Sequence, residues 1–188
     1  MHNSPEEKQC GDCSLCCKIM SIPELNTPKD VWCEHVIKKR GCGIYETRPH
    51  SCRGFQCLWL QDPRLPPDWK PNKAKFVMVG GRGAELVVHV DSNSPGAWRH
   101  EPYLSGLRAI AQAGQAQGGL VVIIERGEST VLLADREVPV GALEADDRIV
   151  SGQVATPSGP RFEVKVMKAG DAARLADTAL DWRRPLRD

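Results

Sequence analysis

The sequence has no long apolar run, no marked excess of charge of either sign, and no cysteine after residue 57. No stretch approaches the roughly 20 apolar residues that a membrane-spanning helix needs. The net charge is +1 with 26% charged residues, which excludes the strongly basic surface typical of nucleic-acid-binding proteins. The first eight residues contain no apolar segment of the kind that directs secretion. We therefore expect a cytoplasmic protein with neither a membrane nor a nucleic-acid partner.

All the cysteines lie in the first third of the chain. They are Cys10, Cys13, Cys16, Cys17, Cys33, Cys42, Cys52 and Cys57. Four of them fall in the run Cys-Gly-Asp-Cys-Ser-Leu-Cys-Cys at residues 10–17. Two residues between thiols let a tight turn aim both sulfurs at one ion. This spacing predicts a thiolate-rich metal site.

The kind of metal is left open by the cysteine pattern. The thiols suffice for two tetrahedral zinc sites, or for one iron–sulfur cluster with thiols left over. The cysteine run of bacterial four-iron ferredoxins, which ends in Cys-Pro, does not occur. Cys16 and Cys17 are adjacent, so we expect their side chains to diverge and to serve different ions, or one of them to stay outside the coordination shell. His35 and His50, each two residues from a cysteine, are further candidate ligands.

Two other uses of the cysteines compete with metal binding: a disulfide framework and a redox-active dithiol. Disulfide frameworks are typical of small secreted domains, and no secretion signal is expected here. Cys10-Gly-Asp-Cys13 is a Cys-x-x-Cys pair. A thioredoxin-like site needs such a pair after a strand, and the sequence predicts no strand before it. Metal binding is the favoured interpretation.

The cysteine blocks also resemble a bacterial family. After the run at residues 10–17 come Gly-Cys-Gly-Ile-Tyr-Glu-Thr-Arg-Pro at 41–49 and Cys-Arg-Gly-Phe-Gln-Cys at 52–57. Together they resemble the CxxCxxCC cysteine-cluster family, the YkgJ-like group of zinc- or iron-chelating domains. That family is related to the cysteine-rich part of flagellin lysine N-methylases. The likeness covers residues 10–60.

The resemblance implies a shared metal-binding set and a second rank of ligands. The shared set is Cys10, Cys13, Cys16, Cys17, Cys42 and Cys52. Cys33 and Cys57 are similar to additions found in some members of the family. Arg48 and Arg53 lie in the same blocks, and we expect them to offset the negative charge of metal-bound thiolates.

Composition divides the chain into four parts. We assign residues 1–60 to a cysteine-cluster metal-binding module, 61–75 to a linker rich in proline and tryptophan, 76–170 to an α+β module and 171–188 to a peripheral tail. Trp59 and Trp69 are expected to anchor the proline-rich stretch by hydrophobic contact.

Hydrophobic periodicity predicts the fold class of the second module. Strands are expected at 74–79, 85–90, 120–125, 130–134 and 161–167, and a helix at 98–117. This order is typical of the α+β class. We predict a small irregular or helical cysteine-rich module, followed by an α+β module with a mainly antiparallel sheet and one main helix.

The C-terminal part contains no recognised catalytic motif. His89, and His100 with Glu101, are its only titratable residues of catalytic character. The favoured function is therefore a non-enzymatic metal-binding protein, in which zinc or iron is structural and the C-terminal module contacts a protein partner. The alternative is an iron–sulfur enzyme or redox protein related to protein N-methylases. Metal storage or delivery would need exchangeable ligands, for which Cys17, Cys33 and Cys57 are the first candidates.

Overall fold

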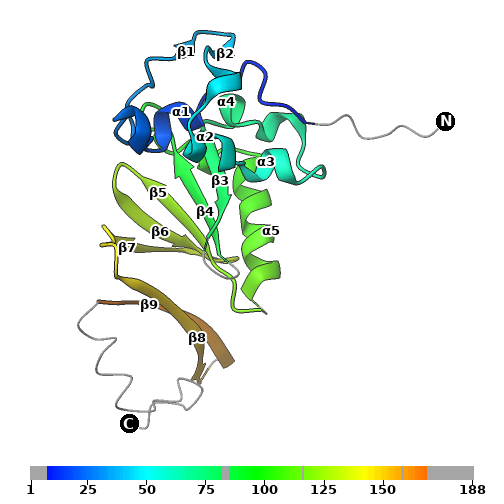
Figure 1. Ribbon diagram of the computed structural model, residues 1–188. Coiled ribbons are helices and arrows are strands. Elements are labelled where there is room, and N and C mark those ends of the chain that lie inside the picture. The colour runs from blue at the N-terminus through cyan, green and yellow to red at the C-terminus, as the bar shows by residue number, and fades with distance from the viewer. Residues whose placement is uncertain (1–7, 82–84, 116, 158, 169–188) are drawn as a thin grey trace, which may run out of the picture.

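The computed structural model describes residues 8–81, 85–115, 117–157 and 159–168. Its largest element is a five-stranded sheet with one long helix beside it, and the cysteine-rich segment lies at one end of this sheet (Figure 1). The predicted α+β class, with a mainly antiparallel sheet and one main helix, is confirmed. The predicted tail at residues 171–188 lies outside the described residues.

Short helices characterise the chain before the sheet. The α-helices are α1 (Cys16–Ile19), α2 (His50–Gly54), α3 (Leu58–Gln61) and α4 (Pro71–Ala74). Single 3₁₀ turns cover η1 (Pro23–Leu25), η2 (Tyr45–Thr47) and η3 (Pro67–Trp69), and a small ladder joins β1 (Val36–Ile37) to β2 (Gly41–Cys42). Helices this short are not stable alone, so tertiary contacts must hold them in place.

The main sheet has the strand order β3-β4-β5-β6-β7. Its strands are β3 (Phe76–Gly80), β4 (Leu86–Val90), β5 (Val121–Glu125), β6 (Glu128–Leu132) and β7 (Glu137–Gly141). Neighbouring strands are antiparallel except β4 and β5, which are parallel. A parallel pair needs a crossover connection, and η4 (Ala97–Arg99) and α5 (Tyr103–Gln115) supply it.

Two features of this part differ from the sequence-based expectation. The helix begins at Tyr103 instead of Trp98, because Pro102 disfavours the helical conformation in the residue before it. An additional strand, β8 (Arg148–Thr156), pairs with β9 (Gly159–Met167) in a separate hairpin. Its burial pattern is irregular, which is why hydrophobic alternation did not predict it.

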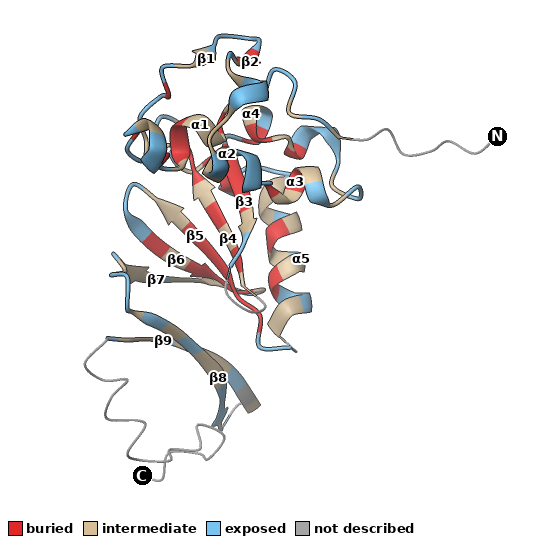
Figure 2. Cartoon of the chain, in the orientation of Figure 1, coloured by how far each residue is buried: buried red, intermediate tan, exposed pale blue. Residues whose placement is uncertain are grey.

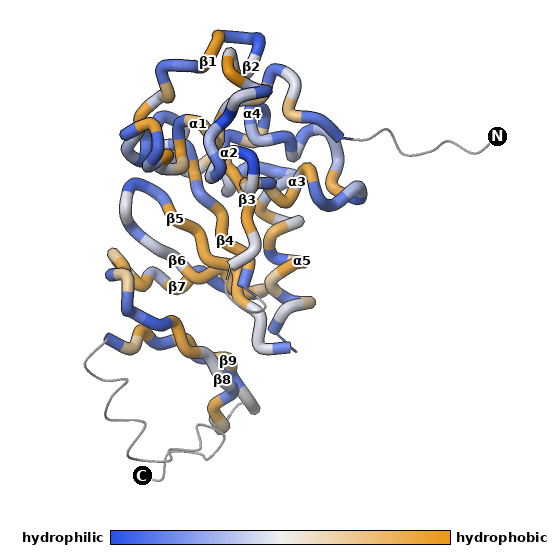
Figure 3. The backbone as a smooth tube through the Cα atoms, in the orientation of Figure 1, coloured by the Kyte–Doolittle hydropathy of each residue, from blue (hydrophilic) through white to orange (hydrophobic). Residues whose placement is uncertain are grey.

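Alternate residues of the sheet face two hydrophobic clusters. Val121 and Ile123 belong to the cluster that contains Leu107 of α5, whereas Val122 belongs to the cluster on the opposite face, against which the β8–β9 hairpin packs. Buried residues concentrate on the central strands and on one side of α5 (Figure 2), where the chain is also most hydrophobic (Figure 3). The sheet is therefore covered on both faces.

The cysteine-rich segment and the sheet share one core. Leu15 and Ile19, which are 5% and 0% exposed, lie in the same cluster as Phe76 and Val88. The indoles of Trp59 and Trp69 belong to the same cluster, so both anchor the proline-rich stretch by hydrophobic contact, as predicted. The first 60 residues thus depend on the sheet for part of their burial.

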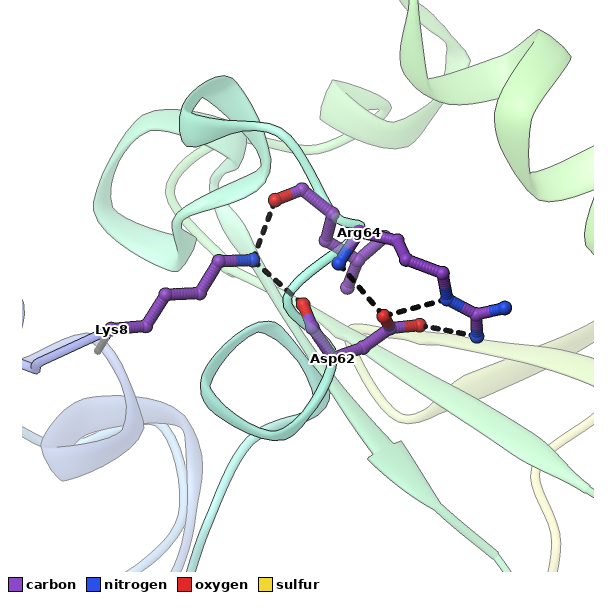
Figure 4. Close-up of polar contacts among 4 residues, drawn as sticks. Lys8, Asp62 and Arg64 are labelled. Atoms are coloured by element: carbon purple, nitrogen blue, oxygen red, sulfur yellow. Dashed lines mark hydrogen bonds and ion pairs between the residues drawn. The ribbon is translucent and has the colours of Figure 1, made fainter. Parts of the chain in front are cut away.

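Lys8 fixes the start of the described chain to the proline-rich stretch. Its Nζ donates hydrogen bonds to the carbonyl oxygens of Asp62 at 2.7 Å and Leu65 at 2.5 Å (Figure 4). The same ammonium lies 4.8 Å from the ring centroid of Trp59. Arg64 in turn donates three hydrogen bonds to the Asp62 carboxylate, from its backbone N–H and its Nε at 2.9 Å each and from its Nη2 at 2.8 Å. These contacts place residues 8–10 beside α3.

Gly106 of α5 is required by the packing of Trp69. A Cβ at position 106 would lie 2.5 Å from Cζ2 of this buried indole, which also packs edge-on against Tyr103. We expect Gly106→Ala to lower the free energy of unfolding by about 1–3 kcal/mol, because overpacking forces the indole or the helix to move. Urea denaturation measures this change.

Gly114→Ala on the same helix is the matched control. A Cβ there would meet Gly119 at 3.5 Å, an ordinary van der Waals distance. The gain in helix propensity should leave this variant neutral or more stable by up to about 1 kcal/mol. Equal destabilisation by both substitutions would contradict the assignment of Gly106 to indole packing.

Candidate metal centre

All eight cysteines line one cavity of about 210 Å³. The structure describes each of them, and each is a free thiol. They come from the loop before α1, from α1 itself, from the turn before β1, from β2, from α2 and from the residue before α3. Because these positions are spread over residues 10–57, only the tertiary fold brings them together.

The adjacent thiols of Cys16 and Cys17 face the same cavity. Their sulfurs lie 4.0 Å apart, although adjacency in the sequence predicts that the side chains diverge. Two sulfur ligands of one tetrahedral zinc ion lie about 3.8 Å apart when each Zn–S bond is about 2.3 Å. The pair is therefore close to a spacing that metal coordination requires.

The remaining sulfurs surround the cavity without meeting at one point. Within residues 8–81 and the other described ranges, no three His, Cys, Asp or Glu side chains converge closely enough to hold an ion as they stand. Metal binding therefore requires the thiols to rotate inward. The donor set itself suits zinc or iron, because soft thiolates in this number are the usual ligands of both.

The first cysteine loop is folded by backbone turns. The Cys13 N–H donates to the Cys10 carbonyl at 2.9 Å, and the Cys17 N–H donates to the Ser14 carbonyl at 2.9 Å. Asp12, at the tip of this loop, accepts hydrogen bonds from Lys70 Nζ at 2.8 Å and Asn72 Nδ2 at 3.2 Å. The loop is thus held against α4, whose Pro71 also lines the cavity.

Gly41 lets β2 approach the first cysteine loop. Its φ angle is +95°, and a Cβ at this position would lie 2.4 Å from the Gly11 carbonyl oxygen. Only glycine fits such a contact. The backbone of β2 therefore lies directly against the first cysteine loop on the Gly41 side of Cys42.

A second set of contacts places the cysteines that come later in the sequence. The Cys33 N–H donates to the Cys17 carbonyl at 3.0 Å, and Cys42 pairs with Val36 in the β1–β2 ladder. In α2, Ser51 donates to the Glu24 carboxylate from its N–H at 3.0 Å and from its hydroxyl at 2.6 Å. This tether fixes the helix that carries Cys52.

Burial dominates the electrostatics of most of these thiols. Desolvation raises the pKa of Cys10, Cys13, Cys52 and Cys57. The hydrogen bond between Cys16 and Cys17, together with burial, raises the pKa of Cys16. The same hydrogen bond, against the effect of burial and with a contribution from Arg48, lowers the pKa of Cys17 to about 7. Most of the thiols therefore stay protonated at neutral pH until a cation compensates the thiolate charge, so binding must release protons.

Two basic side chains lie close to the thiols. Arg48 lines the cavity, with its guanidinium 3.6 Å from the centroid of the Tyr45 ring and its Nε donating to the Tyr45 carbonyl at 2.8 Å. Lys70 lowers the pKa values of Cys10 and Cys13, against the larger effect of burial. Arg53, which the sequence suggests for the same role, is exposed and does not line the cavity. No sequence signal marks Lys70, because only the fold places it beside the first loop.

The candidate imidazole ligands do not reach the cavity. His35 and His50 are both described, and neither lines it. His35 Nε2 faces Glu34 Oε1 at 3.6 Å, and His50 is exposed at the first residue of α2. The apolar remainder of the wall, which the sequence did not predict, includes Phe55 and Leu60.

The candidate catalytic residues of the sheet region lie apart from the cysteines. His100 and Glu101 are exposed, and the Glu101 carboxylate accepts a hydrogen bond from Ser105 Oγ at 2.5 Å. His89 lies on β4, between Val77 of β3 and Ile124 of β5. None of the three lines the cysteine cavity.

His89 makes the stability of the protein sensitive to mild acid. Desolvation by burial, with a contribution from Lys29, lowers its pKa from 6.5 to about 4. A depressed pKa means that the unfolded chain binds the proton more tightly than the folded chain does. The contribution of the neutral His89 to the free energy of unfolding is therefore complete above pH 6.5 and is lost as the pH falls to about 4. We expect a loss of about 3 kcal/mol over this window, at 1.36 kcal/mol per pKa unit.

The substitution His89→Gln isolates this effect. Denaturation of both proteins at pH values from 7.5 to about 4 should show the wild-type chain losing more stability than the variant as the pH falls. Acid effects on the thiols are common to both proteins and cancel in the difference. A difference that stays constant with pH would contradict the predicted titration.

Comparison of the chain with protein-family models, with curated proteins and with solved structures finds no match. The assignment to the cysteine-cluster family therefore stays a prediction from residues 10–60. None of the helices in the described ranges combines the length and the apolar character that crossing a membrane demands.

Proposed function

We propose that this protein is a cytoplasmic metal-binding protein of the CxxCxxCC type, whose thiolates hold zinc in a structural role. The observation that carries the proposal is the convergence of all eight cysteines, from positions 10 to 57, on one cavity. A packing role alone does not explain such convergence, because alanine or valine would fill the same space without the reactivity of a thiol.

The local charges support a cation at this place. Burial raises the pKa values of these thiols, so they stay protonated at neutral pH when no cation is near. A divalent ion would favour their thiolate forms. Arg48 and Lys70 would offset the negative charge of the loaded centre. When bound, zinc would cross-link segments that have few regular hydrogen bonds of their own.

An iron–sulfur centre is the second candidate, and the shape of the site favours it. The sulfurs surround a cavity of about 210 Å³ instead of converging on a point, which leaves room for inorganic atoms between them. On this alternative the protein would belong with redox proteins or with enzymes related to protein N-methylases.

A protein partner is part of the proposal. The favoured partner surface is in the C-terminal module, where Val150 and Val154 of β8 are each 38% exposed. Apolar side chains that are more exposed occur on the cysteine-rich segment, including Trp32 at 50% and Val31 at 48%. Both surfaces are open to contact from another protein.

Elemental analysis with an ultraviolet–visible spectrum, on protein purified without oxygen, tests the proposed function. Zinc in whole-number stoichiometry without visible absorbance would support the structural zinc site. Iron with acid-labile sulfide and a broad visible band would support the second candidate. Protein that binds neither metal, also after refolding with zinc or iron and sulfide, would overturn both.

A further inference from the structure

The β8–β9 hairpin has one covered edge and one open edge. On the β9 side, Arg136 Nη2 donates a hydrogen bond to the Phe162 carbonyl oxygen, and β9 contacts β7 (Figure 1). On the other side, β8 pairs with no strand except β9 in the described part of the chain. A strand of nine residues therefore presents a row of backbone N–H and C=O groups that has no partner strand there.

The Arg136 contact also shows which backbone groups of the hairpin point outward. Residues of an antiparallel pair alternate between those that exchange hydrogen bonds across the ladder and those whose N–H and C=O point away from it. Because the Phe162 carbonyl points to Arg136, Phe162 and its partner Gln153 are of the outward kind. By alternation, the outward backbone groups of β8 belong to Ile149, Ser151, Gln153 and Ala155.

The strand β8 lacks the features that usually keep an open edge from pairing. Those features are charged side chains, proline and short length. Between Arg148 and Thr156 the strand contains neither a charged residue nor a proline. Its apolar side chains Val150 and Val154 are each 38% exposed. In contrast, three charged residues occur in β9: Arg161, Glu163 and Lys165. The open edge of β8 is therefore suited to pairing with another strand.

The sequence of β8 is complementary to itself in antiparallel pairing. Pairing two copies about Gly152 places the outward residues of one strand opposite the outward residues of the other. These facing pairs are Ile149 with Ala155 and Ser151 with Gln153. Each pair can exchange two hydrogen bonds. Val150 then faces Val154 of the second copy at a position of the ladder where side chains approach most closely.

The charges around β8 also fit a second copy of the same strand. Arg148 would lie opposite Thr156 of the second copy, so no like charges face each other across the two-fold axis. The charged residues of β9 would lie on both margins of the joined sheet, outside the valines. An apolar centre with a polar rim is the usual anatomy of a protein interface.

We propose that two copies of this protein associate through β8 and form a four-stranded antiparallel sheet about a two-fold axis at Gly152. The inference names the partner of the C-terminal surface, so it rests on that part of the proposed function and not on the metal. A two-fold interface is closed, so association stops at the dimer. The cysteine-rich segment lies at the opposite end of the molecule from the hairpin (Figure 1), so each copy keeps its own cavity.

Sedimentation velocity on the full chain, over a wide range of micromolar concentrations, tests this association. We expect a concentration-dependent dimer of twice the chain mass of 20.7 kDa. Ser151→Pro removes an outward N–H without removing a hydrogen bond to β9, and it should leave the protein monomeric. Ser151→Thr, which keeps the N–H, is the matched control and should dimerise like the wild-type chain. A wild-type chain that stays monomeric, or a dimer that Ser151→Pro leaves unchanged, would overturn the proposal.

A charge exchange tests the register without depending on the folding of the proline variant. Val150→Lys with Val154→Lys places like charges opposite each other, and it should weaken dimerisation about tenfold or more. Val150→Glu with Val154→Lys places opposite charges there and should restore the dimer. Equal dimerisation of the two double variants would overturn the pairing about Gly152.

Metal content, measured on the same samples, separates this inference from the proposed metal centre. A metal-loaded monomer would contradict the dimer alone. A dimer that binds neither zinc nor iron would contradict the metal centre and leave the pairing of β8 intact.

Discussion

Chelation of the proposed metal ions is expected to unfold residues 10–57 and to destabilise the sheet as well. Structural zinc contributes about 10–16 kcal/mol to the folding of small peptides, whereas a whole domain is typically stable by only about 5–15 kcal/mol. The helices of this segment are four or five residues long, so little else holds them. Leu15 and Ile19 share the core of Phe76, so the loss spreads to β3.

Urea denaturation followed by tryptophan fluorescence, with and without a chelator, measures this effect. Trp59, Trp69 and Trp98 are all buried, so their emission reports on the shared core. We expect the chelated protein to lose most of its stability, and zinc to restore it. Mg²⁺ should not, because it prefers oxygen ligands. An unchanged midpoint in protein shown to have lost its metal would contradict a structural role.

Breaking the buried ion pair between Lys18 and Asp91 should have the second largest effect. Lys18 follows Cys17 in α1 and Asp91 follows β4, and the two residues are only 3% and 7% exposed. Lys18→Met would leave the Asp91 carboxylate buried without its counter-charge. Removing one partner of a buried pair costs about 3–5 kcal/mol. We expect a loss of this size in the free energy of unfolding of the metal-loaded protein.

The double variant Lys18→Met with Asp91→Leu separates the charge effect from loss of packing. Because both charges are then absent, the double variant should be more stable than Lys18→Met alone. Its loss in the free energy of unfolding should be much smaller than the sum of the losses in the two single variants. The matched control is Lys73→Met, which breaks an ion pair with Asp68 whose side chains are 55% and 72% exposed. That control should cost less than about 1 kcal/mol. Additive single effects at Lys18 and Asp91 would show that the pair does not join the segments electrostatically.

The sequence by itself determined the strands β3, β4, β5, β6 and β9, the main helix and the α+β class. Within β5, Val121 and Ile123 face one side of the sheet and Val122 faces the other. An apolar run of this length bounded by polar residues indicates a strand whatever the order of the strands in the sheet. The sequence also placed the thiols in blocks whose spacing suits a metal. The strand β8 escaped detection because its residues do not alternate clearly between buried and exposed.

Only the tertiary structure decided which distant groups meet. The parallel pairing of β4 with β5, the Lys18–Asp91 pair and the position of Lys70 beside the first loop join residues that no local pattern connects. The same holds for the cavity, since Cys10 and Cys57 become neighbours only when α3 packs on the sheet. Spacing along the chain encodes local turns, whereas contacts between distant segments depend on the hydrophobic packing of the whole fold.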